Sequence, residues 1–179
     1  DILFATSTHY NEDPSVTPRP FDERRDGLVC GEGAGVLVLE EYEHARERGA
    51  PIFGEVAGYS TSGSGSSVSQ SSREGMQACI EDAIADSGLR AGDVDYISAH
   101  ATATMQGDQC EAEAIRAVFG GKVLVGGLKG YIGHTLGASG AIELAASLEM
   151  MSRGEIYPTL NLEKVDPACS GITHVQERL

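Results

Sequence analysis

Short apolar runs and longer amphipathic stretches alternate along the chain, which is typical of a protein that layers helices on a sheet. The uninterrupted apolar run from Val36 to Leu39 follows a stretch of small residues, so it predicts a central strand covered on both faces. Three further apolar runs, at 52–59, 94–99 and 122–125, predict more strands. The glycines before Val36 indicate that another backbone or a helix approaches closely there.

The segments between these runs predict four helices, at 41–48, 73–87, 108–119 and 137–153. Glycines follow the first three, as expected at helix ends. In the second, apolar residues recur at the four-residue spacing of a buried helical face. The third is expected to open at Asp108, because an acceptor side chain followed three residues later by a glutamate matches a capping box.

The remaining segments predict loops. Residues 1–25 are broken by three prolines, 61–72 are almost wholly Ser, Gly and Thr, and 126–133 are rich in glycine. Residues 155–179 predict an extended stretch with two prolines. This order of elements predicts a layered α/β fold with close helix–sheet contacts.

Charge and composition exclude several classes of protein. The 179 residues include 27 acidic and 13 basic side chains, and the formal net charge of −14 would repel nucleic acid and anionic membranes. No apolar run approaches the ~20 residues that a membrane-spanning helix needs, and no signal peptide opens the chain. The four cysteines form no C-x-x-C pair, which argues against a disulfide scaffold or a zinc knuckle. We therefore expect a cytoplasmic protein with one ordinary core.

Two histidines stand at positions where α/β proteins keep their chemistry. His100 directly follows the strand predicted at 94–99, and His134 lies on a glycine-flanked loop just before a helix. A single loop histidine is more often a packed or hydrogen-bonded group, but two in equivalent contexts favour function. The other three histidines lack such a context and are expected at the surface: His9, His44 and His174.

Lys129 lies in the same glycine-rich loop as His134, five residues before it, with no other charge nearby in the sequence. If the lysine is buried, its ammonium needs a partner, because an unpaired buried charge is costly. Glu111, on a helix beside the other histidine loop, is the candidate for an ion pair. A solvated lysine is the alternative.

Several other types of site are excluded by spacing. The glycine-rich stretch that ends at Lys129 lacks the spacing and the Ser or Thr of a phosphate-binding loop. Gly31 to Gly35 precedes a strand where a dinucleotide fingerprint requires a helix. His100, Cys110 and His134 do not have zinc-ligand spacing. No metal or cofactor is expected, and all four cysteines are expected to be structural: Cys30, Cys79, Cys110 and Cys169.

Five motifs in order resemble the C-terminal half of the β-ketoacyl-acyl-carrier-protein synthases, in particular the elongating type II fatty-acid enzymes and their polyketide relatives. The similarity runs over nearly the whole chain. The motifs are Arg19-Pro20-Phe21-Asp22, the block from Arg25 to Glu41, His100-Ala101-Thr102-Ala103-Thr104, Lys129 with Gly133-His134, and Asn161-Leu162.

The resemblance implies a fold, a division of the chain and a reaction. The fold is the C-terminal half of a thiolase-like, layered αβαβα architecture. Residues 1–26 would connect to the N-terminal half, and residues 27–179 would form the C-terminal ketosynthase domain, incomplete at its C-terminal end. The reaction is the decarboxylative condensation of an acyl group, held on a cysteine, with malonyl-acyl carrier protein in fatty-acid or polyketide synthesis.

The resemblance also assigns roles to the candidate residues. His100 and His134 match the family's two histidines, which donate hydrogen bonds to the malonyl thioester oxygen. Lys129 and Glu111 match its lysine and glutamate, and the expected ion pair would hold the histidine loops. Fixed donors aimed at an enolate oxygen lower the barrier to decarboxylation.

Parts of the family pattern are missing or altered. The acyl-accepting cysteine lies upstream of this sequence in the family and the closing Gly-Phe-Gly-Gly-Thr-Asn segment lies downstream, so this chain alone is predicted to be inactive. Ala101 stands where the family has glycine, and an alanine forced to a positive φ costs roughly 1 kcal/mol or more. Gly126 and Gly127 replace the usual serine or threonine, and 61–72 lacks the typical Tyr-His-Met-Thr stretch.

Two alternatives remain open. The first is a non-catalytic, chain-length-factor-like partner of a ketosynthase, which usually lacks the histidines; the second, weaker one is a thiolase-like degradative enzyme. The expected partners are acyl carrier protein and a second synthase subunit, in a homodimer or a heterodimer. Because the carrier is acidic, an acidic chain needs a local basic patch to dock it, and the candidates are Arg24, Arg25 and Lys122.

Overall fold

A small parallel sheet lies at the centre of the computed structural model, which describes residues 5–63 and 71–179. Its strands are β1 (Tyr96–Ser98), β2 (Leu124–Gly126) and β3 (Thr173–His174), in the order β1-β2-β3. Tyr96 is in register with Leu124, and Leu124 with Thr173. Because all three strands run the same way, their carboxyl ends lie at one edge of the sheet.

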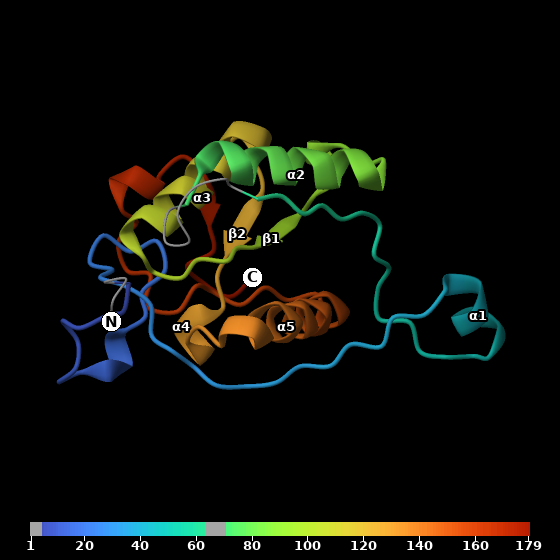
Figure 1. Cartoon of the computed structure of the whole chain (residues 1–179), viewed down its shortest axis with the longest axis horizontal. Coiled ribbons are helices and arrows are strands. Elements are labelled where there is room, and N and C mark those ends of the chain that lie inside the picture. Colours follow the sequence, from blue (N-terminus) through green and yellow to red (C-terminus); the bar gives the residue numbers. More distant parts are fainter. Residues whose placement is uncertain (1–4, 64–70) are drawn as a thin grey trace.

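Helices cover the sheet on both faces (Figure 1). Helices α2 (Arg73–Ser87) and α3 (Met105–Phe119) lie on one side and pack against each other. Helices α4 (Lys129–Ile132) and α5 (Ser139–Arg153) lie on the other. The result is the layered α/β arrangement that the sequence predicts.

The core fills the space between the sheet and α3. Val125, at the centre of β2, and Ile115, on α3, are both fully buried. Phe21 enters the same cluster from the segment before β1, and Leu162 enters it from the segment between α5 and β3. The α3 face is built mainly from small and branched residues, so the helix lies close to the strands.

The helices predicted at 41–48, 73–87 and 137–153 are confirmed, the first as α1 (Tyr42–Glu47). Gly88 ends α2 with a left-handed φ of 69°, as expected of a glycine that follows a helix. Within residues 5–63 and 71–179, four short 3-10 turns complete the elements: Pro14–Val16, Ala91–Asp93, Leu136–Ala138 and Pro167–Cys169.

Two local predictions are wrong. The third helix begins at Met105 and not at Asp108, which lies in its first turn; the Asp108 carboxylate accepts instead from the backbone amides of Phe21 and Ala103. The glycine-rich segment 126–133 is not all loop, because α4 forms within it. At Asp108 the contact with Phe21, 87 residues away in the sequence, replaces the predicted capping role.

The strands predicted at 36–39 and 52–59 do not form within the described part of the chain. Both segments are extended but pair with no described strand, and Val36 is 92% and Phe53 68% exposed. One side of each is close to α5: a Cβ added at Gly35 would lie 2.7 Å from the Cβ of Ala141. The prediction that this apolar run is covered on both faces is therefore wrong for this chain by itself.

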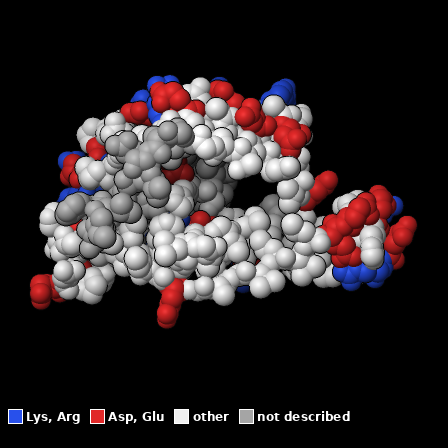
Figure 2. Space-filling model, viewed as in Figure 1, with Lys and Arg blue, Asp and Glu red and all other residues white. Residues whose placement is uncertain are grey.

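These two extended segments lead to and from α1, which projects away from the layered body (Figure 1). Figure 2 shows an opening between the α2 side and the α5 side of the molecule, bordered on one side by the segment that runs from α1 towards α2. Acidic and basic side chains gather together on α1. The extended segments thus present apolar side chains beside an open space.

The serine-rich stretch predicted as a loop at 61–72 falls partly outside the described residues, because 64–70 are not described. Of the helices that the structure describes, none combines the length and the hydropathy needed to cross a membrane.

Candidate active site

The carboxyl ends of β1 and β2 bring His100 and Lys129 together. His100 lies two residues beyond β1, and Lys129 lies three residues beyond β2. Because these strands are parallel neighbours, both residues emerge at the same edge of the sheet. The Lys129 ammonium lies 3.3 Å from His100 Nδ1. This is the edge at which α/β sheets usually place their chemistry.

His134 reaches the same place from the far end of α4. Its ring centroid lies 5.0 Å from that of His100, and the two rings meet edge to face at 84°. The backbone of His134 is held by the extended segment beside it: its amide donates to Val29 and its carbonyl accepts from Gly31. The two histidines singled out by sequence therefore share one site.

Lys129 is fully buried, and its partner is Glu143 on α5, with 2.6 Å between Nζ and Oε1. The predicted ion pair with Glu111 is wrong: no described oxygen of Glu111 lies within ion-pair distance of Lys129. The reason is that Glu111 is already occupied by backbone donors. The prediction that Lys129 is buried with a carboxylate partner is correct, but the identity of that partner is not.

Glu111 holds the first histidine loop directly. Its two carboxylate oxygens accept from the backbone amides of His100, at 2.7 Å, and Ala101, at 2.8 Å. Burial raises the pKa of the Glu111 carboxyl, although the two amides and Lys129 act in the opposite direction. Asp108, one turn earlier on α3, accepts from Ala103 in the same loop at 3.0 Å. Two carboxylates on one helix face thus fix the loop that carries His100.

This loop has an unusual backbone. Ala101 has a φ of 39° and Ala103 a φ of 66°, the left-handed region that costs an L-residue roughly 1–2 kcal/mol. The strain expected at Ala101 is thus confirmed, and Ala103 is strained as well. The carboxylates of Glu111 and Asp108 bond the amides of these two residues and so offset the strain.

Hydrogen bonding assigns the ring hydrogens. An ammonium can only donate, so His100 Nδ1 accepts from Lys129 and Nε2 carries the ring hydrogen. The backbone amide of Leu136 donates to His134 Nδ1 at 3.3 Å, which likewise leaves the hydrogen on Nε2. The site therefore contains two Nε2–H donors in one small region.

Both imidazoles are held neutral. Burial, the Lys129 ammonium and the neighbouring His134 lower the pKa of His100 to about 4. Burial and Lys129 also lower the pKa of His134, and Glu143 partly offsets this effect. At neutral pH the site thus offers neutral N–H donors beside one buried cation, an arrangement that can stabilise negative charge on an oxygen.

Sequence reasoning missed Glu143 and Ser139. Glu143 is the only Asp, Glu, Lys or Arg between 130 and 148, and an isolated carboxylate in a helix of small residues was the available signal. Ser139 gave no signal of its own. Its hydroxyl lies 3.0 Å from His134 Nδ1.

The other side chains considered at the sequence level lie elsewhere. His174 is not a free surface group as predicted: it is partly buried, and its ring packs at a tilt of 54° against Phe21, with the ring centroids 4.8 Å apart. Its Nε2 lies 2.9 Å from the Cys169 carbonyl oxygen. Burial raises the pKa of the Cys169 thiol to about 12 and also raises that of Cys110. None of the four cysteines has a described hydrogen bond to either site histidine.

A buried ionic cluster contacts the loop that carries His100. Arg19 and Asp22 are both fully buried and 3.1 Å apart, and Arg19 also binds Glu163. Arg25 is 3% exposed and pairs with Asp166, so it is unavailable as the docking residue predicted above. Arg25 instead donates to the Thr104 carbonyl at the end of the His100 loop.

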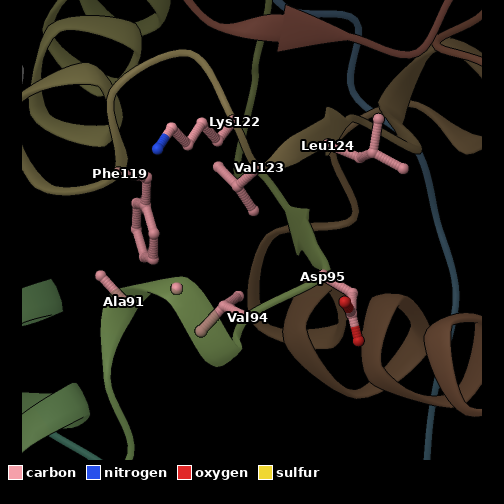
Figure 3. Close-up of a pocket in the computed structure, with 8 residues that line it drawn as sticks. Ala91, Val94, Asp95, Phe119, Lys122, Val123 and Leu124 are labelled. Atoms are coloured by element: carbon pink, nitrogen blue, oxygen red, sulfur yellow. The ribbon is translucent and has the colours of Figure 1, made fainter.

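One cavity, of about 490 Å³, lies at the opposite edge of the sheet (Figure 3). Val94, Asp95 and Leu124 line it at the start of β1 and β2, and Lys122 and Phe119 close one side. Neither His100 nor His134 lines this cavity. A second cavity, of about 330 Å³ and apolar, lies between α4 and α5 and is lined by Leu128, Tyr131, Ile132, Ile142, Ala146 and Tyr157.

Comparison with known families agrees with this geometry. Residues 53–163 match the model of the β-ketoacyl synthase C-terminal domain, and residues 5–45 match that of the N-terminal domain. The mitochondrial 3-oxoacyl-[acyl-carrier-protein] synthase of Arabidopsis thaliana is 44% identical over 91% of this chain and 37% of its own length. The 3-oxoacyl-[acyl-carrier-protein] synthase 2 of Rhizobium meliloti is 41% identical over 97% of this chain and 43% of its own length.

Solved structures show the same fold. A β-ketoacyl synthase from Burkholderia phymatum superposes with a TM-score of 0.96 and 46% identity, over 99% of this chain and 43% of that one. A type II polyketide ketosynthase, solved with its acyl carrier protein, gives a TM-score of 0.94 and 34% identity over 99% of this chain and 45% of that one. The predicted α/β fold, part of a thiolase-like layered architecture, is confirmed. The chain spans about two-fifths of the length of these relatives, and it belongs to the β-ketoacyl synthase family.

Proposed function

We propose that this chain is the donor-bearing part of a β-ketoacyl-acyl-carrier-protein synthase, which condenses an acyl thioester with malonyl-acyl carrier protein in fatty-acid or polyketide synthesis. The observation that carries the proposal is the pairing of two neutral imidazoles, each with its hydrogen on Nε2, beside a buried Lys129. Such donors suit a reaction in which negative charge develops on a carbonyl oxygen.

In the proposed reaction, the bond between the malonyl Cα and its carboxylate breaks and releases carbon dioxide. The electron pair moves into the thioester, and His100 and His134 stabilise the enolate oxygen through Nε2–H. The enolate carbon then attacks the acyl carbonyl, and the cysteine thiolate that carried the acyl group leaves. Lys129 and Glu143 hold His100 in position, and Glu111 holds the backbone of its loop.

The acyl-carrying cysteine would come from sequence outside this chain. Cys169 is buried with a raised pKa, which opposes nucleophilic use, and Cys110 sits on α3 with a raised pKa too. Cys30 lies beside His134 in the extended segment, but no described hydrogen bond joins its sulfur to an imidazole. We therefore expect the 179-residue chain alone to be inactive.

The apolar segments at 36–39 and 52–59 are uncovered in this chain. We expect the remainder of the N-terminal domain to cover them. The N-terminal domain model matches only residues 5–45 here, and that match includes the first of the two segments. The division into a connector at 1–26 and a C-terminal domain at 27–179 stays a prediction.

Acyl carrier protein is the proposed partner, as it is for the polyketide ketosynthase solved in complex with its own carrier. Another relative is solved as a ketosynthase with a chain length factor, at a TM-score of 0.86 and 35% identity over 95% of this chain and 43% of that one. A catalytic role is favoured over a chain-length-factor role because His100, Lys129 and His134 form one intact site. A cytoplasmic location stays a prediction.

The test compares the chain alone with the chain joined to both missing parts of the family pattern, the rest of the N-terminal domain and the closing segment. Condensation of an acyl thioester with malonyl-acyl carrier protein is expected only in the joined form. Replacing His100 or His134 by alanine should lower the rate about 100–1000-fold, the usual effect of losing one oxyanion donor. Turnover by the 179 residues alone, or full activity of either variant in the joined form, would overturn the proposal.

A further inference from the structure

Ser139 is the first residue of α5, and its hydroxyl lies directly behind the His134 ring. Its oxygen is 3.0 Å from His134 Nδ1 and 3.1 Å from Thr135 Oγ1. The residue is only 4% exposed, and Thr135 only 7%. A hydroxyl this well buried must find its partners within the protein, and here both belong to the loop that carries the second site histidine.

The directions of these hydrogen bonds follow from one fixed donor. The Leu136 amide points its hydrogen at His134 Nδ1, so this nitrogen has no hydrogen of its own. Ser139 must therefore donate to Nδ1, and its oxygen is free to accept the Thr135 hydroxyl hydrogen. The resulting chain of donors runs from Thr135 to Ser139 to His134.

The serine bond is the better of the two that reach Nδ1. The Leu136 amide lies 3.3 Å away, at the long end of the range for a hydrogen bond to nitrogen, and its residue has a left-handed φ of 52°. At 3.0 Å, the hydroxyl can follow small shifts of the ring because it rotates freely. Without the hydroxyl, a long bond from a strained backbone would hold the ring alone.

We propose that Ser139 is a positioning residue that keeps His134 in the tautomer with its hydrogen on Nε2, the form that can donate to substrate. The tautomer is a property of the chain without substrate. Only the effect of Ser139 on catalysis rests on the proposed function. Ser139 touches no reacting atom and acts through the imidazole of His134.

The tautomer can be read from the ring nitrogens of ¹⁵N-histidine-labelled protein by NMR, using the 179-residue chain at pH 8. His134 is expected to carry its hydrogen on Nε2. In Ser139→Ala the ratio of the Nδ1–H to the Nε2–H form should rise about fivefold, the effect of losing one hydrogen bond. Ser139→Thr keeps the hydroxyl and should restore the original ratio. Ser147→Ala removes a hydroxyl of α5 that bonds only a backbone carbonyl, and it should change nothing.

Two results would overturn the proposal: a wild-type His134 with its hydrogen on Nδ1, or an unchanged ratio in folded Ser139→Ala. If that variant does not fold, Ser139→Cys, of similar size and with a weaker donor, should give an intermediate ratio, and an unchanged one counts against the proposal. In the joined enzyme, Ser139→Ala should lower kcat and leave KM unchanged. A shifted tautomer with an unaltered kcat would leave the role of Ser139 intact and reject the role assigned to His134.

Discussion

The methyl group of Ala101 occupies the space that a side chain at position 127 would need. A Cβ added at Gly127 would lie 2.8 Å from Ala101 Cβ, closer than carbon atoms pack. Position 101 is glycine and position 127 serine or threonine in the family that the sequence resembles. The two departures noted at positions 101 and 127 therefore face each other across the ends of β1 and β2.

Gly127→Ala should destabilise the chain by about 1–3 kcal/mol, the usual cost of overpacking a filled site. In an Ala101→Gly background the same change should cost much less, because the methyl group it meets is gone. Urea unfolding of the four proteins gives the coupling energy. Gly140→Ala, on α5 where an added Cβ meets nothing, is the matched control and should be neutral or stabilising. Equal costs in both backgrounds would refute the coupling.

Lys129→Met should cost about 3–5 kcal/mol of unfolding free energy, because it leaves the Glu143 carboxylate without its cation. The double variant Lys129→Met/Glu143→Leu should recover most of that loss, since it removes both charges. Arg153→Met breaks the exposed pair with Glu149 on the same helix and should leave the free energy of unfolding almost unchanged. A double variant as unstable as the single one would show that the pair is not the dominant interaction.

His100 should stay neutral down to about pH 5, because its pKa is lowered to about 4. The unfolded chain, with an ordinary histidine pKa near 6.5, then binds the extra proton first, so His100 makes stability fall as pH drops from 6.5 to 4. His100→Asn should remove this part of the pH dependence. NMR titration of the ring measures the pKa directly, and Lys129→Met should raise it by removing the nearby cation. A wild-type value near 6.5 would contradict the electrostatics described above.

Asp22 should also make stability fall as the pH drops, but at lower pH than His100, because its pKa too is lowered in the folded chain. Burial alone would raise its pKa, but hydrogen bonds from Arg19 and from the backbone amides of Lys164, Arg24 and Glu163 outweigh it and lower the pKa to about 2. Its contribution, about 2 kcal/mol, is complete above pH 4 and is lost as the pH falls through 2. Asp22→Asn should flatten the acid limb of the stability curve. Asp13→Asn, at an exposed position, should leave that limb in place.

The apolar side chains at 36–39 should govern assembly and not the stability of the chain itself. Val38 is 84% exposed, so Val38→Thr should leave the unfolding transition within about 0.5 kcal/mol of its original value. It should also reduce self-association of the isolated chain and weaken its binding to a separately expressed N-terminal segment. Light scattering and co-purification measure the two effects. Glu43→Gln, on the neighbouring α1, is the control.

Much of this fold was predictable because local patterns agree with it. The apolar spacing in α2 and the glycine that ends it need no distant partner. The wrong predictions at Asp108 and at Val36 to Leu39 share one cause, which is that partners distant in the sequence decide what a local pattern becomes. Asp108 has the sequence of a helix cap but serves Phe21, 87 residues away, and Val36 to Leu39 has the sequence of a buried strand without described neighbours.

The sequence was enough to predict which residues form the site, but not which carboxylate pairs with Lys129. His100, Lys129 and His134 follow from loop position, but Glu143 displaces Glu111 as the lysine's partner. Spacing along a chain does not reveal which of two buried carboxylates faces a cation. Glu111 accepts hydrogen bonds from the backbone amides of His100 and Ala101, which converge on it only in the folded loop.

Every side chain that braces the imidazole pair, from α3, α4 and α5, comes from within these 179 residues. In the proposed reaction, the groups that would stabilise the enolate oxygen are therefore held in place by residues of this chain alone. In the proposed enzyme, the part that supplies the cysteine and lines the acyl pocket could therefore change, and the substrate range with it. The residues of this chain could stay the same.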